Sequence, residues 1–200
     1  LENPDEHGLL ASCGQPCLGV QMRVVDEEGR DLEPGAVGEI VVRSKRIMSE
    51  YWCKPEDTQE TIKEGWLHTG DLARMDDEGF FYIVDRKKDM IVSGGENIYP
   101  REIENVLIGH PAIADVAVVG IPDPDWGESV KAFVVLEAGQ HLDEQGVIDI
   151  CREFLAGYKK PKSVVFLDSI PKNALGKVLK HVLKETRNTP VAGDDSVKRR

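Results

Sequence analysis

The sequence lacks several features that mark special classes of protein. No apolar run approaches the roughly 18–20 residues that a membrane-spanning helix requires. The first six residues are polar and acidic, so they form no signal peptide, although a truncated chain would have lost any native leader. Only four of the 200 residues are cysteine, and Cys13 and Cys17 have no second ligand pair that would complete a zinc site. We therefore expect reduced structural thiols and a cytoplasmic protein.

The chain also has little positive charge in its first part. Residues 1–85 hold 8 Lys and Arg against 19 Asp and Glu, whereas residues 86–200 hold 17 of each, so the net charge of −11 falls on the first part. Residues 158–184 carry seven lysines and one acid, Asp168. This basic strip suits a small polyanion such as a nucleotide or CoA, but it also fits a solvated lysine face. The pI near 5 and the lack of a recognition motif argue against nucleic-acid binding.

Short β-rich runs separated by turn clusters predict antiparallel β structure in the first part of the chain. The runs cover residues 20–25, 38–43 and 79–84, and the turn clusters cover 27–30 and 76–79. These 85 residues are too few to close a barrel with an independent core. We interpret them as the end of a larger domain.

Strands and helices alternate after residue 86 and predict a compact α+β domain over residues 90–185. Pro100 stands at a helix start, and Asp143 is a plausible N-cap of a helix that Gly157 stops. From residue 186 to 200 the chain is polar without periodicity, which predicts a disordered tail. The remaining expected elements are strands at 113–121, 129–136 and 164–167 and a short helix at 179–183.

Four short patterns follow one another in a fixed order over about half of the chain. They are Gly65-Trp66-Leu67-His68-Thr69-Gly70-Asp71, Asp85-Arg86-Lys87-Lys88-Asp89, Ser93-Gly94-Gly95-Glu96-Asn97-Ile98-Tyr99-Pro100 and Pro171-Lys172-Asn173-Ala174-Leu175-Gly176-Lys177. Together they resemble the C-terminal third of the adenylate-forming enzymes, which include acyl-CoA synthetases, luciferases and the adenylation domains of peptide synthetases. The resemblance covers about residues 5–184 and is closest to fatty-acyl and related acyl-CoA synthetases.

The resemblance implies a chain of two parts. Residues 1–85 match the β-rich end of the family's N-terminal AMP-binding domain, residues 86–89 match its hinge, and residues 90–185 match its C-terminal α+β lid domain. The Ser/Thr/Gly-rich phosphate-binding loop of the family has no match here. We therefore expect a fragment that is inactive alone and whose partner is the missing N-terminal domain. The acyl pocket and the ligands of an expected Mg²⁺ ion would then lie upstream of residue 1.

Three residues match the nucleotide-handling positions of the family. Lys177 matches the lysine that bridges the acyl carboxylate and the α-phosphate, where a long cation can stabilise spreading negative charge. Asp71 matches the ribose-binding acid of the family. A carboxylate suits that role, because it can accept hydrogen bonds from both hydroxyls of a cis-diol. Arg86 matches the arginine that contacts ribose and phosphate with a rigid, permanently charged group. Taken alone, Lys177 would be an ordinary surface lysine and Asp71 an ordinary turn residue.

Four further residues match the moving parts of the family. Lys88 matches the hinge about which the small domain rotates between two half-reactions, since a few backbone dihedrals can absorb such a rotation. Gly94, Gly95 and Glu96 match the segment that lines the tunnel for the pantetheine arm of CoA. At the position of Gly95, a bulky side chain would block this tunnel. The competing interpretations are two solvated lysines in a loop and a plain Gly-Gly turn.

The implied reaction has two steps, with ATP and CoA as cofactors. A carboxylic acid and ATP give acyl-AMP and pyrophosphate, and CoA then gives the thioester and AMP. The alternatives are a non-catalytic module that binds a nucleotide, CoA or a partner domain, and the same domain from a luciferase-like or peptide-synthetase enzyme. Among other residues, His68 is expected to pack rather than to act as a base, and Glu102 and Glu104 are expected to be solvated helix charges.

Overall fold

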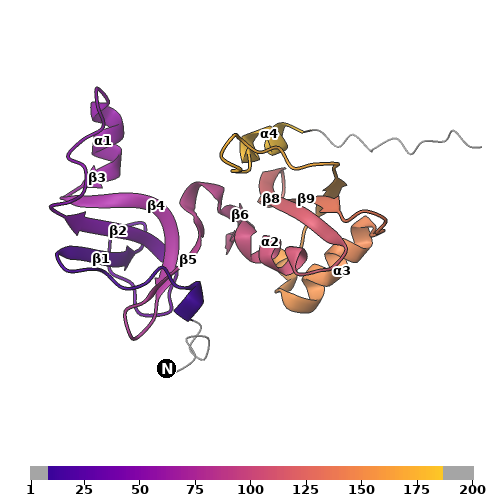
Figure 1. The fold of residues 1–200 in the computed structure, drawn as a ribbon, viewed down its shortest axis with the longest axis horizontal. Coiled ribbons are helices and arrows are strands. Elements are labelled where there is room, and N and C mark those ends of the chain that lie inside the picture. Colours follow the sequence, from indigo (N-terminus) through magenta and orange to yellow (C-terminus); the bar gives the residue numbers. More distant parts are fainter. Residues whose placement is uncertain (1–8, 187–200) are drawn as a thin grey trace, which may run out of the picture. The chain divides into compact units, whose positions relative to one another are not determined.

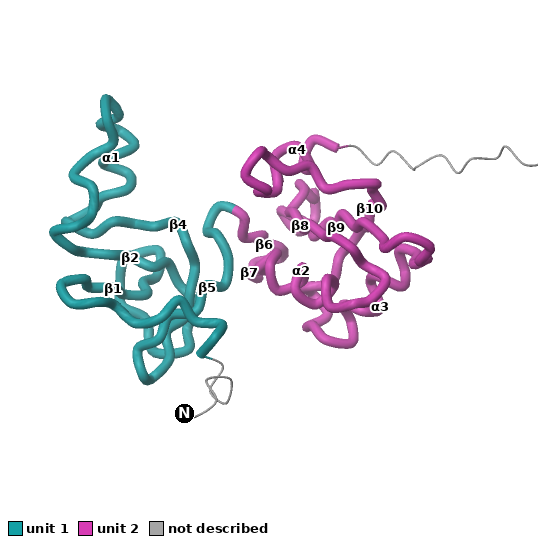
Figure 2. The backbone as a smooth tube through the Cα atoms, viewed as in Figure 1, with its two compact units in different colours: residues 1–88 teal, residues 89–200 magenta. Residues whose placement is uncertain are grey.

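The computed structural model describes residues 9–186. The chain divides into two compact units, residues 1–88 and 89–200 (Figure 2). The tail predicted to be disordered lies outside the described residues, apart from Thr186. None of the helices within residues 9–186 combines the length and the apolar character that crossing a bilayer requires.

The first unit is built on a five-stranded antiparallel sheet. The strands run in the order β1-β2-β4-β3, and β5 pairs with β4 (Figure 1). Inward-facing side chains of four strand positions form its core: Val24, Ile40, Ala73 and Phe81. The elements are β1 (Val20–Val25), β2 (Gly38–Ser44), α1 (Pro55–Thr61), β3 (Ile62–Lys63), β4 (Trp66–Met75) and β5 (Phe81–Arg86).

The expectation of antiparallel β structure over the first part of the chain is confirmed, with two local differences. Strand β5 begins at Phe81 rather than at residue 79, because the amide of Asp76 donates to the carbonyl of Phe80 and closes a turn there. Helix α1 was not expected, although Pro55 stands at its first turn, where a missing N–H is harmless.

The second unit holds another five-stranded sheet with helices on both sides. The strands run in the order β10-β9-β6-β7, and β8 pairs with β9. All of these pairs are antiparallel except β10 with β9, which is parallel. The predicted α+β fold class is therefore confirmed. The elements are β6 (Ile91–Ser93), β7 (Glu96–Ile98), α2 (Pro100–Ile108), β8 (Ile113–Asp123), β9 (Gly127–Leu136), α3 (Glu144–Phe154), β10 (Ser163–Phe166) and α4 (Lys180–Glu185).

Strands β8 and β9 are buried on both faces. Alternate side chains of β8 point to opposite sides of the sheet, as the two-residue period of a strand requires. Val116 and Val118 belong to one apolar cluster with α2 and α3, whereas Ala117 and Val119 belong to another cluster with Ile170 and α4. Figure 1 shows α4 on one side of these strands and α2 and α3 on the other. The segment that carries the lysine motif is therefore part of the second core.

Local signals set the ends of helix α3. The predicted N-cap is confirmed, because the side chain of Asp143 accepts a hydrogen bond of 2.8 Å from the amide of Gly146. The predicted stop at Gly157 is wrong. The helix ends at Phe154, and the next residue, Leu155, has an extended backbone that leads into a short 3-10 turn from Gly157.

We expect Asp143→Ala to lower the free energy of unfolding of the 200-residue chain by about 1 kcal/mol, because the amide of Gly146 loses its acceptor. Asp143→Ser retains an N-cap oxygen and should restore most of this loss. Urea denaturation followed by circular dichroism measures both variants. Equal stability of the alanine and serine variants would contradict a capping role.

Candidate active site

Asp71 and Arg86, which are fifteen residues apart in the sequence, lie opposite each other in the first unit. The register of β4 and β5 pairs the two residues directly. The Nε of Arg86 donates a hydrogen bond of 2.8 Å to Oδ1 of Asp71. The side chain of Arg86 is 42% exposed and that of Asp71 is 36% exposed, so both stay accessible to a ligand. The structure thus brings together the two residues predicted to contact ribose.

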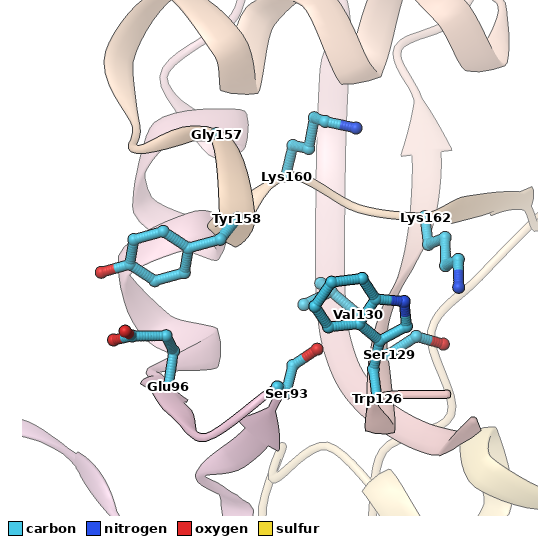
Figure 3. A pocket seen from close by; sticks show the side chains of 10 residues that line it. Ser93, Glu96, Trp126, Ser129, Val130, Gly157, Tyr158, Lys160 and Lys162 are labelled. Atoms are coloured by element: carbon cyan, nitrogen blue, oxygen red, sulfur yellow. The ribbon is translucent and has the colours of Figure 1, made fainter. Parts of the chain in front are cut away.

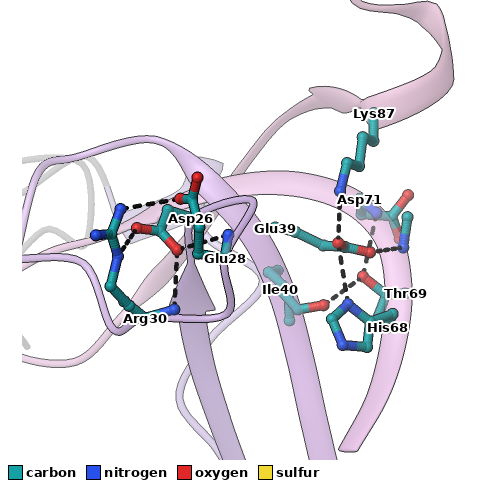
Figure 4. Close-up of polar contacts among 10 residues, drawn as sticks. Asp26, Glu28, Arg30, Glu39, Ile40, His68, Thr69, Asp71 and Lys87 are labelled. Carbon is teal, nitrogen blue, oxygen red and sulfur yellow. Dashed lines mark hydrogen bonds and ion pairs between the residues drawn. The ribbon is translucent and has the colours of Figure 1, made fainter. Parts of the chain in front are cut away.

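A buried carboxylate that the sequence did not single out lies behind this pair. Glu39 of β2 accepts hydrogen bonds from the amide of Gly70 at 3.1 Å and from Nζ of Lys87 at 3.0 Å. It also contacts Nδ1 of His68 at 3.1 Å (Figure 4). Burial raises the pKa of the Glu39 carboxyl, but the bonds to His68, Lys87 and Gly70 outweigh burial and leave this pKa below its usual range. Glu39 therefore stays ionised and holds the peptide that precedes Asp71.

The same carboxylate anchors the chain as it leaves the first unit. Lys87–Asp89 forms a short 3-10 turn, and the two compact units meet in the sequence between Lys88 and Asp89. The side chain of Lys87 is tied to Glu39, whereas Lys88 is exposed. Backbone freedom for a rotation is consequently expected at Lys88 or beyond, and the hinge assignment stays a prediction.

Gly94 and Gly95 form the tight turn between β6 and β7 in the second unit. Both have a positive φ, of 60° and 87°, a conformation that favours glycine. The amide of Gly94 donates to the carbonyl of Trp126 at 2.9 Å, and the indole of Trp126 lies against Gly94. Glu96 is the first residue of β7 and is exposed. The three predicted tunnel residues are therefore neighbours on one edge of the sheet.

A pocket of about 280 Å³ adjoins this turn. Figure 3 shows the rings of Tyr158 and Trp126 on opposite sides of it, with Lys162 on the side of Trp126 and Lys160 between the two sides. Nζ of Lys162 donates 2.8 Å to a carboxylate oxygen of Asp123. Two aromatic faces and the uncaptured ammonium of Lys160 next to a glycine turn suit a planar, anionic ligand. The sequence signal for this pocket was the basic strip, whereas both aromatic residues were missed.

Lys177 is the last residue of a hydrogen-bonded turn that begins at Asn173. Oδ1 of Asn173 accepts from the amides of Leu175 and Lys177, both at 2.9 Å. Backbone bonds join the amide of Asn173 to the carbonyl of Lys177 and the amide of Gly176 to the carbonyl of Asn173, again at 2.9 Å. Gly176 has a φ of 78°. The lysine is thus presented on an ordered turn, with Leu175 exposed beside it.

The lysines of the basic strip fall into two groups. Four form ion pairs with carboxylates: Lys159 with Glu102, Lys162 with Asp123, Lys172 with Asp115 and Lys180 with Glu104. Across residues 9–186, Lys160, Lys177 and Lys184 take part in no ion pair. The basic strip is therefore largely neutralised, and Lys177 is one of three cations left for a ligand.

The expectation that Glu102 and Glu104 are solvated helix charges is wrong. Glu102 binds Nζ of Lys159 with both oxygens, at 2.8 and 2.7 Å. Glu104 accepts from the amide of Val118 at 2.8 Å and pairs with Lys180. Both acids instead join α2 to segments that lie far away in the sequence.

Two family models match the sequence. The model of the AMP-binding enzyme C-terminal domain matches residues 102–177, and the model of the AMP-binding enzyme matches residues 1–52. The chain belongs to the AMP-binding enzymes. Its relatives are acyl-CoA ligases and related adenylating enzymes, so the resemblance indicated by the four motifs is confirmed.

Three relatives illustrate the similarity. Feruloyl-CoA synthase from Amycolatopsis sp is 47% identical over 171 residues, which cover 86% of this chain and 35% of that protein. Long-chain-fatty-acid–CoA ligase from Escherichia coli O157:H7 is 47% identical over 174 residues, which cover 87% and 31%. o-Succinylbenzoate CoA synthetase (MenE) from Bacillus subtilis, solved with the acyl-adenylate intermediate OSB-AMP, has a TM-score of 0.84 at 38% identity, with 92% of this chain and 37% of that chain covered. The chain thus spans about a third of the length of the curated relatives it matches.

Metal ligands are a separate question in an AMP-binding enzyme. In the described part of the chain, no three His, Cys, Asp or Glu side chains are grouped so that they could hold a metal ion. The Mg²⁺ ion expected from the resemblance has its ligands assigned to sequence upstream of residue 1. That assignment stays a prediction.

We expect Gly94→Ala to displace the indole of Trp126, because a Cβ at residue 94 would lie 2.5 Å from Cε3 of that ring. The matched control is Gly95→Ala, which also has a positive φ but whose Cβ would meet no atom within 4 Å. Backbone strain of about 1–2 kcal/mol is common to both variants. The indole N–H signal of Trp126 in a ¹⁵N NMR spectrum should move in Gly94→Ala alone. Equal shifts in both variants would mean that the contact does not order the ring.

Proposed function

We propose that this chain is the C-terminal part of an ATP-dependent acyl-CoA synthetase and is inactive alone. The complete enzyme joins a carboxylic acid to the thiol of CoA through an acyl-AMP intermediate, with release of pyrophosphate and AMP. Support comes from relatives that are named as a feruloyl-CoA synthase and a long-chain-fatty-acid–CoA ligase, of which the matched stretch covers 35% and 31%. The side chains gathered in the two units supply charge and shape for both steps.

The observation that carries the proposal is the exposed ammonium of Lys177 on its ordered turn. Attack of a carboxylate on the α-phosphate brings two anions together, and negative charge spreads over the phosphate oxygens. A cation that is held in position and not already paired stabilises that charge without reorganisation. Within residues 9–186 Lys177 meets this requirement, since four hydrogen bonds order its turn and no carboxylate pairs with it.

Asp71 and Arg86 are proposed to hold the ribose of the nucleotide. Arg86 binds Oδ1 of Asp71, and across residues 9–186 Oδ2 of this carboxylate receives no hydrogen bond. A ribose hydroxyl can therefore donate to Asp71 without displacing the arginine. Glu39 keeps this arrangement in place, because it holds the amide of Gly70, directly before Asp71.

The pocket beside Gly94 is proposed to take the nucleotide end of CoA. The rings of Trp126 and Tyr158 offer faces for the adenine base, and Lys160, which forms no ion pair within residues 9–186, offers charge for the phosphates. The turn at Gly94 and Gly95 adjoins this pocket and has no side chain that fills the approach. Pantetheine is proposed to run along this turn, past Glu96.

Lys88 is proposed as the pivot between the two half-reactions. One unit holds Asp71 and Arg86, whereas the other holds Lys177 and the glycine turn, so one chain carries groups for two different chemical steps. A rotation at Lys88 would bring first Lys177 and then the glycine turn of the second unit to the bound acyl nucleotide. The clamp of Glu39 on Lys87 supports a pivot that begins after residue 87.

We expect Lys177→Ala in the complete synthetase to slow acyl-AMP formation by roughly 10²–10³-fold, which corresponds to about 3–4 kcal/mol of lost charge stabilisation. Conversion of supplied acyl-AMP to thioester should keep its rate, because the lysine acts only in the first transition state. The matched control is Lys184→Ala, which removes another exposed cation without an ion pair in the described part of the chain. ATP–pyrophosphate exchange and single-turnover thioester formation measure the two steps.

Three results, from these assays and from two related measurements, would count against parts of the proposal. Equal loss in both half-reactions would assign Lys177 a structural role. Exchange by the isolated 200-residue chain well above background would refute the statement that it is inactive alone. Binding of CoA by the complete protein without any exchange would favour the alternative of a non-catalytic CoA-binding module, which the pocket beside Trp126 also supports.

We expect Gly95→Leu to impair the second step instead. Its side chain would project into open space at the edge of the CoA pocket, so it should obstruct pantetheine while ATP chemistry continues. Acyl-AMP should accumulate on the enzyme in single-turnover measurements. The matched control is Gly139→Leu, at a φ of 78° and with no atom within 4 Å of its Cβ, which carries the same backbone strain outside the pocket. Slower acyl-AMP formation with normal thioester formation would contradict the tunnel assignment.

A further inference from the structure

The turn that carries Lys177 occurs three times within residues 9–186 with the same hydrogen bonds. In each case an Asp or Asn side chain accepts from the amides two and four residues further along, and the residue in between is a glycine with φ near 80°. Backbone bonds from the first amide to the fifth carbonyl and from the fourth amide to the first carbonyl close each turn. The three turns are Asp26–Arg30, Asp76–Phe80 and Asn173–Lys177.

The three turns differ in the charge of their first and last residues. In the first turn, Oδ2 of Asp26 binds Nε of Arg30 at 2.7 Å, so the carboxylate that orders the turn also captures the cation at its end. The amide and the side chain of Arg30 both hold the pKa of the Asp26 carboxyl below its usual range. In the third turn the same two places hold Asn173 and Lys177, and the lysine ammonium has no ion pair within residues 9–186.

We infer that Asn173 is the positioning residue for Lys177: its amide oxygen fixes the peptide of the lysine, and its neutrality leaves the ammonium uncaptured. The inference rests on the proposed function for the role of Lys177, but not for the geometry of the turn. Aspartate accepts the same two backbone bonds in the other two turns, so turn geometry alone does not explain an asparagine here. A group that must order a cation without neutralising it has to be an uncharged acceptor.

The base of the turn is independently fixed, which leaves its own bonds to set the position of Lys177. Lys172 binds Asp115 of β8 at 2.6 Å, and the amide of Leu179 donates to the carbonyl of Pro171 at 2.9 Å. Ile170 is buried in the core under the sheet. Because a misplacement of about 1 Å can lower a catalytic rate by roughly 10²-fold, loss of the two bonds to Asn173 should be visible in the adenylation rate.

The first measurement uses the 200-residue chain labelled with ¹⁵N and records amide exchange with water. In Asn173→Ala the amides of Leu175 and Lys177 should exchange about fivefold faster or more, because each loses one hydrogen bond. In Asn173→Asp both amides should keep their wild-type rates. Asp26→Ala is the matched control, in which the same acceleration should appear at Glu28 and Arg30 only. Unchanged exchange in Asn173→Ala would overturn the inference.

The second measurement uses the complete synthetase and separates the two half-reactions. Asn173→Ala should slow acyl-AMP formation by about 10–100-fold and leave thioester formation from supplied acyl-AMP within about twofold. Asn173→Asp should keep the turn but also slow acyl-AMP formation by about tenfold or more, since its carboxylate captures Lys177 as Asp26 captures Arg30. Asp26→Ala should leave both steps within about twofold. Melting temperatures of the variants show whether any loss follows stability instead.

Each result supports or overturns one statement. If Lys177→Ala abolishes adenylation but Asn173→Ala behaves like Asp26→Ala, the positioning role is overturned and the proposed function stands. If Asn173→Asp has the wild-type rate, the neutrality of residue 173 is irrelevant and that half of the inference is overturned. If Lys177→Ala leaves adenylation intact, the proposed function fails, whereas the exchange measurement still decides whether Asn173 orders the turn.

Discussion

Burial of both faces of the β8–β9 pair is the constraint on which the second unit depends. A strand whose successive side chains are all apolar cannot leave either side of its sheet in water. Helices α2 and α3 cover one face, and the segment that runs from Ile170 to α4 covers the other. The lysine motif is therefore not an appendage, because the residues on both sides of it form the second layer of the core. Phe133 of β9 and Leu183 of α4 are buried in the same cluster where the layer packs on the sheet, and each Å² of apolar surface removed from water there contributes about 25 cal/mol of stability.

Polar contacts tie this covering layer at three places along its length. Lys172 pairs with Asp115 before the turn, Lys180 pairs with Glu104 at the start of α4, and Nζ of Lys131 donates to the carbonyl of Thr186 at its end. Lys131 is buried, and burial lowers the pKa of its ammonium. Both ion pairs are partly exposed to water, so each adds little free energy and they act mainly by fixing the position of the layer. Of the lysines in this layer, Lys172 and Lys180 thus fix its register through ion pairs, whereas Lys177 and Lys184 form none within residues 9–186.

Local patterns in the sequence predicted most of the elements, but not the contacts between distant side chains. The N-cap at Asp143 depends on an amide three residues away, so the sequence alone was enough. Glu39 was missed because its partners Gly70 and Lys87 lie 31 and 48 residues further along and meet it only through the order of the sheet. The same limit explains the wrong expectation for Glu104, whose helix looks solvent-exposed until β8 and α4 are placed against it. The resemblance selected single residues, whereas strand register brought them together.

The turn at Asn173 shows where a local rule and a functional demand diverge. All three turns have an Asp or Asn followed three residues later by glycine, although the same spacing at Asp143 and Gly146 begins helix α3 instead. Two of these turns directly follow a strand, β1 or β4, and an aspartate serves there because its charge is either paired with Arg30 or hydrogen-bonded to Tyr82. At Lys177 a carboxylate would meet those structural needs equally well, yet the residue is an amide. This departure from an otherwise repeated solution occurs in the turn that presents the proposed catalytic cation, and it is better explained by charge than by folding.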